Sequence, residues 1–485
     1  MLSYLPVAHA LSPIIVVFGA LMLLPLAVAH GLADGVERQY DVSVLVTLLA
    51  GALLWIASRP YRGELQRQHG FLLVALAWTV LPAFATLPLL FALPQLSFTD
   101  AYFETVSAMT TTGATVLVGL DQLPASINLW RGLLQWVGGM GVVVLAVAIL
   151  PLLGVGGRQL FLAETPGPIK EARLTPRIAE TAKGLWKVYC IITVACILAY
   201  WLVGMTWLDA VVHAFTTLSL GGYSTHDASF GFFNSPAIEA VSIFFMLIAG
   251  VNFSTHFVAF SRHSLGAYRH DSEMVAFLVV LAASCLGIAT YLWAAGTYPS
   301  FVTALRYAAF NVVSIATTTG YANTDYNVWP VFASLWMLAL CSFASCSGST
   351  GGGMKMIRVQ LMAIQTWREM TRILHPSAVA PVKIRGHRVE NTTVFAVLAF
   401  MLAFGLTTAL ATFLLTFSGL EFVTSFSAAV ATITNTGPGL NEVGPAANYA
   451  ALLPFQKWVL IAAMLLGRLE IFTLLVVFTP AFWRR

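Results

Sequence analysis

The sequence predicts an all-α polytopic membrane protein in which four similar helical units surround one axis. Three observations carry this prediction. Of the 485 residues, 58% are apolar and only 9% are charged, whereas soluble domains carry roughly a quarter charged residues. Apolar runs long enough to cross a bilayer, which takes about 20 residues, recur along the whole chain. Short runs rich in Thr and Gly recur between them at matching positions.

Ten apolar runs have spanning length. They cover residues 11–31, 41–58, 71–92, 128–151, 184–204, 235–260, 274–296, 328–346, 391–417 and 455–478. Four further helix-compatible segments hold only about 12 to 16 residues, which is too short for a crossing. These half-helices lie near residues 99–112, 207–221, 304–319 and 421–436. Bilayers tolerate such segments only inside protein, so we expect the half-helices to line a pathway.

The basic residues predict the orientation of the chain. Among the 25 Lys and Arg, only Arg38, Arg131, Arg306 and Lys457 fall on one side of the predicted spans, and Arg468 falls inside the last span. All the others fall on the opposite side, which the positive-inside rule assigns to the cytoplasm. We therefore expect both termini in the cytoplasm and the four half-helices to enter from outside.

Each half-helix ends in a run of small residues with one aligned glycine. The four runs, called here the half-helix loops, are residues 110–113, 219–222, 317–320 and 434–437. One unit consists of a span, a half-helix, a loop and a second span, and two crossings per unit give every copy the same orientation. Four copies can therefore surround one pore. The predicted division is two peripheral spans in residues 1–70 and pore units at 71–157, 158–261, 262–390 and 391–485.

The half-helix loops have the composition of a cation filter. Glycine permits positive φ, which lets successive carbonyl groups face one axis. Rings of carbonyl oxygens replace the hydration shell of a monovalent cation, whereas a site for polyvalent cations would be expected to bring carboxylates. None of the four loops contains Asp or Glu. The alternative is that each loop is merely a tight turn, but four copies in register favour the filter.

A glycine-rich segment at residues 346–355 predicts a gate. Its glycines and hydroxyl residues disfavour a helix at a depth where the other units remain apolar. We interpret it as a flexible intramembrane loop; the alternative is that the span ends near Ser345 and a cytoplasmic linker follows. It is not a phosphate-binding loop, because Met354 separates Gly353 from Lys355. The candidate gate residues in this segment are Gly348, Ser349, Thr350, Gly351, Gly352, Gly353 and Lys355.

Arg468 lies near the middle of the last predicted span. A charge at that depth costs about 3 kcal/mol on insertion scales, so its side chain should face the protein interior or water. Glu470 is two positions away and points to nearly the opposite side of a helix, so the partner of Arg468 must come from another element. Our hypothesis is that Arg468 and the glycine-rich segment hold the pathway closed. The alternative is a structural arginine bound to buried carbonyl groups.

The four half-helix loops, within residues 71–478, resemble those of the Trk/Ktr/HKT superfamily of potassium transporters. The extra leading spans make the chain most similar to the branch that supplies the membrane subunit of the bacterial Trk potassium-uptake system. The resemblance implies K⁺ as the bound and transported ion, no organic cofactor, and a gating loop at the glycine-rich segment. It also implies a filter of backbone oxygens at each aligned glycine and the two residues before it: Thr111, Thr112, Gly113, Leu220, Gly221, Gly222, Thr318, Thr319, Gly320, Asn435, Thr436 and Gly437.

The loops depart from the TVGYG signature of potassium channels. Leu220 replaces threonine in the second loop, and Pro438 follows the glycine of the fourth. We therefore expect a shorter and less symmetric filter than in those channels.

The same resemblance implies partners and a location. It implies a homodimer in the lipid of the bacterial inner membrane and a cytoplasmic TrkA-like nucleotide-binding ring protein. That ring would dock on the basic loops 158–187, 262–273 and 355–390, although basic cytoplasmic loops are also ordinary determinants of topology. A net charge of +4 gives no indication of a nucleic-acid partner.

The sequence thus predicts potassium-selective uptake through a gated pathway under the control of a cytoplasmic subunit. One alternative is a potassium symporter coupled to H⁺ or Na⁺, whose reversal potential would shift with both ions. Another class, an intramembrane enzyme, would need a catalytic dyad or a metal cluster. The sequence contains neither HExxH nor a paired intramembrane Asp, so we do not expect an enzyme.

Overall fold

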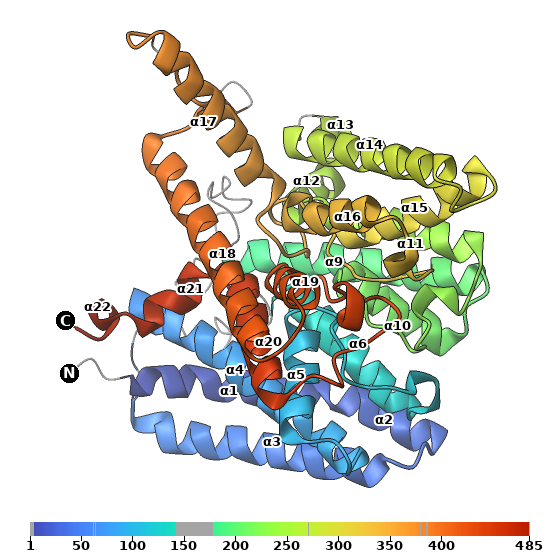
Figure 1. The fold of residues 1–485 in the computed structure, drawn as a ribbon. Helices are drawn as coiled ribbons and strands as arrows, with labels where there is room; N and C mark the ends of the chain where they lie inside the picture. The colour runs from blue at the N-terminus through green and yellow to red at the C-terminus, as the bar shows by residue number, and fades with distance from the viewer. Residues whose placement is uncertain are drawn as a thin grey trace.

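A computed structural model describes residues 4–141 and 178–484, apart from residues 62, 64, 270, 379, 385 and 386. Three helices precede the predicted pore units and lie along one side of the molecule (Figure 1): α1 (Leu5–Leu21), α2 (Leu23–Leu32) and α3 (Glu37–Ser58). Together α1 and α2 form one apolar span of 28 residues. The ring of Tyr4 lies 4.9 Å from that of Trp483, so the two ends of the described chain meet at the same end of the molecule.

The remaining helices form four successive sets. Each set has a long helix, then a short half-helix, then a further helix that follows the half-helix loop. The first set is α4 (Arg67–Ala92), α5 (Phe98–Met109) and α6 (Ala125–Gly139). The second is α9 (Ile178–Leu202), α10 (Trp207–Leu218), α11 (Pro236–Gly250) and α12 (Phe253–Arg262), followed by the single turn α13 (Gly266–Arg269).

The third and fourth sets repeat this order. The third is α14 (Ser272–Ala294), α15 (Phe301–Ala316) and α16 (Val331–Phe343), followed by α17 (Met356–Leu374), which projects away from the other helices in Figure 1. Two strands of two residues each, β1 (Lys383–Ile384) and β2 (His387–Arg388), pair in antiparallel register, with Lys383 opposite Arg388. The fourth set is α18 (Asn391–Phe417), α19 (Phe422–Ile433), α20 (Pro454–Arg468), α21 (Phe472–Leu475) and α22 (Pro480–Trp483).

Six helices of the described residues are long and apolar enough to cross a membrane, and two further bent pairs raise the number to eight. The bends lie where the sequence predicted single spans at 235–260 and 455–478, so those spans are broken. Between α11 and α12 the axis turns by 93°, because Asn252 starts a new helix by accepting a hydrogen bond from the Ser254 amide. After α20 it turns by 107°, through positive φ at Glu470 and Ile471.

The two other shortened spans are α6, of 15 residues, and α16, of 13 residues. The part of the first that was predicted to extend to residue 151, and the unit boundary at residues 157 and 158, lie outside the described residues. After α16 the chain leaves the helix before residue 346 and resumes it at Met356.

The half-helices start at hydroxyl caps in three of four cases. Ser97, Thr206 and Ser300 each accept a hydrogen bond from the backbone amide three residues later. These bonds satisfy N–H groups that the first helical turn leaves without a partner. At the start of α19, Glu421 makes no such side-chain bond.

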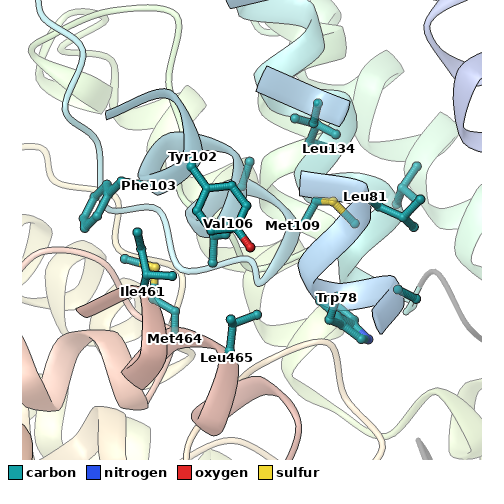
Figure 2. Close-up of a cluster of buried hydrophobic side chains, with 14 of the residues drawn as sticks. Trp78, Leu81, Tyr102, Phe103, Val106, Met109, Leu134, Ile461, Met464 and Leu465 are labelled. Atoms are coloured by element: carbon teal, nitrogen blue, oxygen red, sulfur yellow. The ribbon is translucent and has the colours of Figure 1, made fainter. Parts of the chain in front are cut away.

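The first half-helix, α5, is enclosed by other helices. Every residue from Ala101 to Met109 is buried, including polar ones. Figure 2 shows its apolar side chains against those of α4, α6 and α20. The labelled contacts come from Trp78, Leu81, Tyr102, Phe103, Val106, Met109, Leu134, Ile461, Met464 and Leu465. The first and fourth helix sets therefore share one core, and the half-helix lies inside protein, as its length requires.

Candidate functional site

The four half-helix loops share an unusual backbone conformation. In each loop the aligned glycine has positive φ, and so does the residue two positions before it. The values are 55° and 83° at Thr111 and Gly113, 53° and 74° at Leu220 and Gly222, 63° and 87° at Thr318 and Gly320, and 55° and 96° at Asn435 and Gly437. A left-handed conformation costs a residue with a side chain about 1 to 2 kcal/mol. Backbone strain of this kind clusters at functional sites, so the four half-helix loops are the candidate site.

Hydrogen bonds to the half-helices fix these conformations. The residue before each aligned glycine donates its amide to a carbonyl group five residues earlier, at 2.8 to 2.9 Å. The pairs are Thr112 with Ser107, Gly221 with Thr216, Thr319 with Ser314, and Thr436 with Ala431. All four loops therefore leave their half-helices in the same way, so the four sequence repeats also share one backbone geometry.

The aligned glycines join the loops into a closed ring. A Cβ atom at Gly113 would overlap the carbonyl oxygen of Gly221, and the same relation links each loop to the next. Gly222 lies against Thr319, Gly320 against Thr436, and Gly437 against Thr112. Any side chain at these glycines would collide with backbone, and positive φ disfavours one independently. The first loop follows the fourth around the ring, so the twelve predicted filter residues lie together around one axis.

Hydroxyl pairs brace three of the four loops. Thr110 and Thr112 are hydrogen-bonded at 2.7 Å, and the equivalent pairs Thr317 with Thr319 and Thr434 with Thr436 at 2.8 Å. The second loop has Ser219 and Gly221 at these positions and lacks the pair. We expected the second loop to differ from the others because of its sequence. In the structure it differs also in having no hydroxyl pair to brace its backbone.

A buried ion pair behind the first loop was missed by the sequence analysis. Arg131 was assigned to the outer side only as a topology residue, yet it is 1% exposed and its Nε lies 2.9 Å from a carboxylate oxygen of Glu104. Its guanidinium carbon also lies 4.2 Å from the centre of the Tyr223 ring. Glu104 accepts the amide of Val116 at 3.0 Å. The signal was available, because two ionisable residues in short apolar helices are expected to pair inside the protein.

The glycine-rich segment packs against the inner ends of three half-helices. The Thr350 hydroxyl donates to the Leu218 carbonyl at 2.9 Å, and the Gly352 amide donates to the Thr318 hydroxyl at 2.8 Å. A Cβ atom at Gly352 would overlap the carbonyl oxygen of Thr434. The segment thus contacts the end of the second half-helix and the third and fourth half-helix loops, which is not the geometry of a separate linker.

One carboxylate holds both ends of this segment. The same oxygen of Glu273 accepts the amide of Ser347 at 2.7 Å and the amide of Ile357 at 3.0 Å. Within the segment, the buried Lys355 ammonium donates to the Gly351 carbonyl. Glu273 could not be selected from the sequence, because its partners are backbone groups 74 and 84 positions away.

Arg468 joins the glycine-rich segment to the first helix set. Its guanidinium donates to the Thr350 carbonyl at 3.0 Å, and to the carbonyl groups of Gly138 and Gly139 at 2.5 and 3.0 Å. These partners come from other elements, as its depth in the last span required. Glu470 instead pairs with Arg358 at 2.6 Å.

In the segments that follow the first two half-helix loops, a histidine bridges the first two units. His226 Nδ1 lies 2.5 Å from Asp121, and its Nε2 lies 3.4 Å from Asp209. Burial opposes the charge on His226, but its bonds to Asp209 and Asp121 outweigh this effect and raise its pKa above the ordinary value. The pKa of Asp121 is lowered: burial opposes its charge, but the bond to His226 prevails. Both shifts favour the charged forms of His226 and Asp121, and the contact joins the segments that follow the half-helix loops of the first two units.

Comparison with known proteins identifies the family. The TrkH family, described as cation transport proteins, matches residues 40–485. The chain belongs to the TrkH family. A Trk system potassium uptake protein TrkH from Salmonella typhimurium is 46% identical over 97% of both chains, and one from Halomonas elongata is 45% identical over 99% of both. The crystal structure of the potassium transporter TrkH from Vibrio parahaemolyticus matches with a TM-score of 0.90 and 42% identity, covering 100% of both chains.

Membership of the TrkH family confirms two predictions. The resemblance stated from the half-helix loops is correct, and the chain is an all-α multi-pass membrane protein. Among the predicted docking loops, residues 158–177 lie outside the described residues, whereas 262–273 and 355–390 are described except for residues 270, 379, 385 and 386.

Proposed function

We propose that this protein conducts potassium into the cell through the axis of the four half-helix loops. The ring of contacts between each aligned glycine and the next loop is the observation that carries the proposal. It gathers four equivalent sets of backbone carbonyl groups around one axis, the arrangement that replaces the hydration shell of K⁺. The TrkH relatives are named as potassium uptake proteins, which supports K⁺ as the transported ion.

The half-helices support a cation at the same place. Their C-terminal ends, which carry partial negative charge, all lead into the ring. The ligands in this proposal are carbonyl oxygens of the twelve filter residues, from Thr111–Gly113, Leu220–Gly222, Thr318–Gly320 and Asn435–Gly437. The four pore units are residues 71–157, 158–261, 262–390 and 391–485, with residues 1–70 as a peripheral pair of spans.

The glycine-rich segment and Arg468 form the gate in this proposal. The segment lies against the C-terminal ends of the second, third and fourth half-helices, and Arg468 ties it to the end of α6, beside the first half-helix. Together they place backbone and one fixed positive charge next to the inner side of the ring. Displacement of the segment would open the pathway, and a fixed cation there raises the barrier for K⁺ while the segment is in place.

The proposal also covers the oligomeric state, the membrane and the regulatory partner. The protein acts as a homodimer in the bacterial inner membrane with both termini in the cytoplasm. A cytoplasmic TrkA-like nucleotide-binding ring controls the gate. The Trk system named in the relatives supports a multi-component assembly, and the excess of basic residues on one side of the spans supports cytoplasmic termini.

Flux into sealed liposomes that hold only the purified chain tests the proposal. We expect K⁺ to enter faster than Na⁺ when each is supplied alone, and a Gly113→Ala variant to lose this flux because its Cβ would strike the second loop. Equal entry of both ions, or K⁺ entry that survives Gly113→Ala unchanged, would contradict the filter.

A further inference from the structure

The second half-helix loop is the one that lacks a braced threonine. Gly221 occupies the position of Thr112, Thr319 and Thr436, whose hydroxyl groups pair within their own loops. Glycine also leaves this strand with more conformational freedom than the other three. Ligands of a binding site are held in a productive geometry by packing and supporting hydrogen bonds, so a support for the second strand is expected where the threonine is absent.

The side chain of Gln135, on α6, lies in the space of the missing threonine. A Cβ atom at Gly221 would overlap the amide group of Gln135. The Gln135 amide N–H donates to the Gly221 carbonyl at 2.6 Å, and its oxygen accepts the Tyr223 amide at 3.1 Å. The fully buried Gln135 side chain is therefore hydrogen-bonded to the residue before the aligned Gly222 and to the residue after it.

We propose that Gln135 is a positioning residue for ion selectivity, which holds the second filter strand in place of the absent threonine. This inference rests on the proposed function. The Gly221 carbonyl belongs to the ring, because it lies against Gly113 as Thr319, Thr436 and Thr112 lie against the other aligned glycines. The Gln135 N–H, bound to this carbonyl oxygen, restricts where the oxygen can lie, while the other three strands are braced by their own hydroxyl pairs.

The geometry also predicts that a threonine is tolerated at position 221 only when the Gln135 side chain is shortened. The φ of Gly221 is not positive, so the backbone there accepts a threonine. The three atoms nearest to a Cβ at this position all belong to the Gln135 amide group. Shortening Gln135 to alanine would open this space, and a threonine at 221 would then lie two residues from Ser219, as Thr112 lies from Thr110.

The test is the ratio of K⁺ to Na⁺ flux into liposomes holding the full-length chain. Gln135→Met keeps the length of the side chain but removes both hydrogen bonds. We expect it to lower the ratio about fivefold, the effect of losing the one bond that holds the Gly221 ligand carbonyl. Gly221→Thr alone should also lower the ratio, because the new side chain collides with Gln135. The double variant Gln135→Ala/Gly221→Thr should recover most of the wild-type ratio, which a loss of folding or general loosening would not produce.

The matched control is Gln456→Met. Gln456 is a buried glutamine at the start of α20 that accepts the Leu453 amide and donates to the Ser418 hydroxyl. Neither partner belongs to a half-helix loop, so the replacement should leave the ratio unchanged. A wild-type ratio near one would contradict the proposed function itself. A selective wild type whose ratio survives Gln135→Met, or a double variant no better than Gly221→Thr alone, would overturn the role of Gln135.

Discussion

Replacing Arg468 with alanine should release the gate. The guanidinium bridges the Thr350 carbonyl of the glycine-rich segment and the carbonyl groups of Gly138 and Gly139 at the end of α6. Alanine removes every one of these bonds and the fixed positive charge. Both changes favour ion passage, because the segment loses its tie to the first helix set and the pathway loses a repelling charge.

The size of the effect follows from the bond to Thr350. A hydrogen bond to a charged donor contributes about 1.5 to 3 kcal/mol, and each 1.36 kcal/mol changes an equilibrium constant tenfold. Losing this bond alone should therefore raise the population of the displaced segment about 10- to 150-fold while that population is small. Potassium flux through the isolated chain should rise with it, up to the limit set by the open pathway.

The assay is K⁺ flux into liposomes at equal amounts of reconstituted protein. Arg306→Ala is the matched control, because Arg306 pairs with Glu239 away from the glycine-rich segment, and its flux should stay at the wild-type level. Arg468→Lys separates two causes: it keeps the charge but cannot reproduce the forked contacts of a guanidinium, so a hydrogen-bonded latch predicts intermediate flux. Unchanged or lower flux in a well-folded Arg468→Ala variant would refute the reasoning.

Three further predictions follow from the surrounding contacts. Glu104→Ala leaves Arg131 as a buried unpaired charge, which costs about 3 to 5 kcal/mol, so the thermal unfolding midpoint in detergent should fall; an unchanged midpoint would contradict the pair. Glu273→Ala frees both ends of the glycine-rich segment, so liposome K⁺ flux should rise, and a decrease would show that Glu273 does not restrain the segment. The raised pKa of His226 means that its contribution to stability is full below its unfolded value of about 6.5 and is lost as the pH rises through the folded value. The difference in unfolding temperature between wild type and His226→Ala should therefore be larger at pH 6 than at pH 9, and a difference that grows with pH would contradict the assignment.

The sequence could predict features that repeat. The aligned glycines at 113, 222, 320 and 437 identified the half-helix loops because four copies in register cannot be explained as separate turns. The same repetition gave the cyclic arrangement, since equal orientation of the units leaves one axis to share. The unwound segment after α16 was predictable from its glycines, because helix propensity is a local property.

Features that depend on contacts between distant residues could not be predicted. Gln135 is an ordinary helical residue in the sequence, and its role depends on the empty space at Gly221. The bend after α20 comes from positive φ at Glu470 and Ile471, within an apolar run long enough to be one straight span. Arg131 was the exception: its position in an apolar helix was a sufficient signal for a buried partner.

The most direct test of the account is the reversal potential of the purified chain in a planar bilayer, with K⁺ on one side and Na⁺ on the other and the pH varied independently. The account predicts a potential that lies toward the K⁺ equilibrium value and does not move when a proton gradient is imposed. A potential near zero would contradict the four-loop filter. One that shifts with the proton or sodium gradient at constant K⁺ would show a coupled symporter instead of a selective pathway.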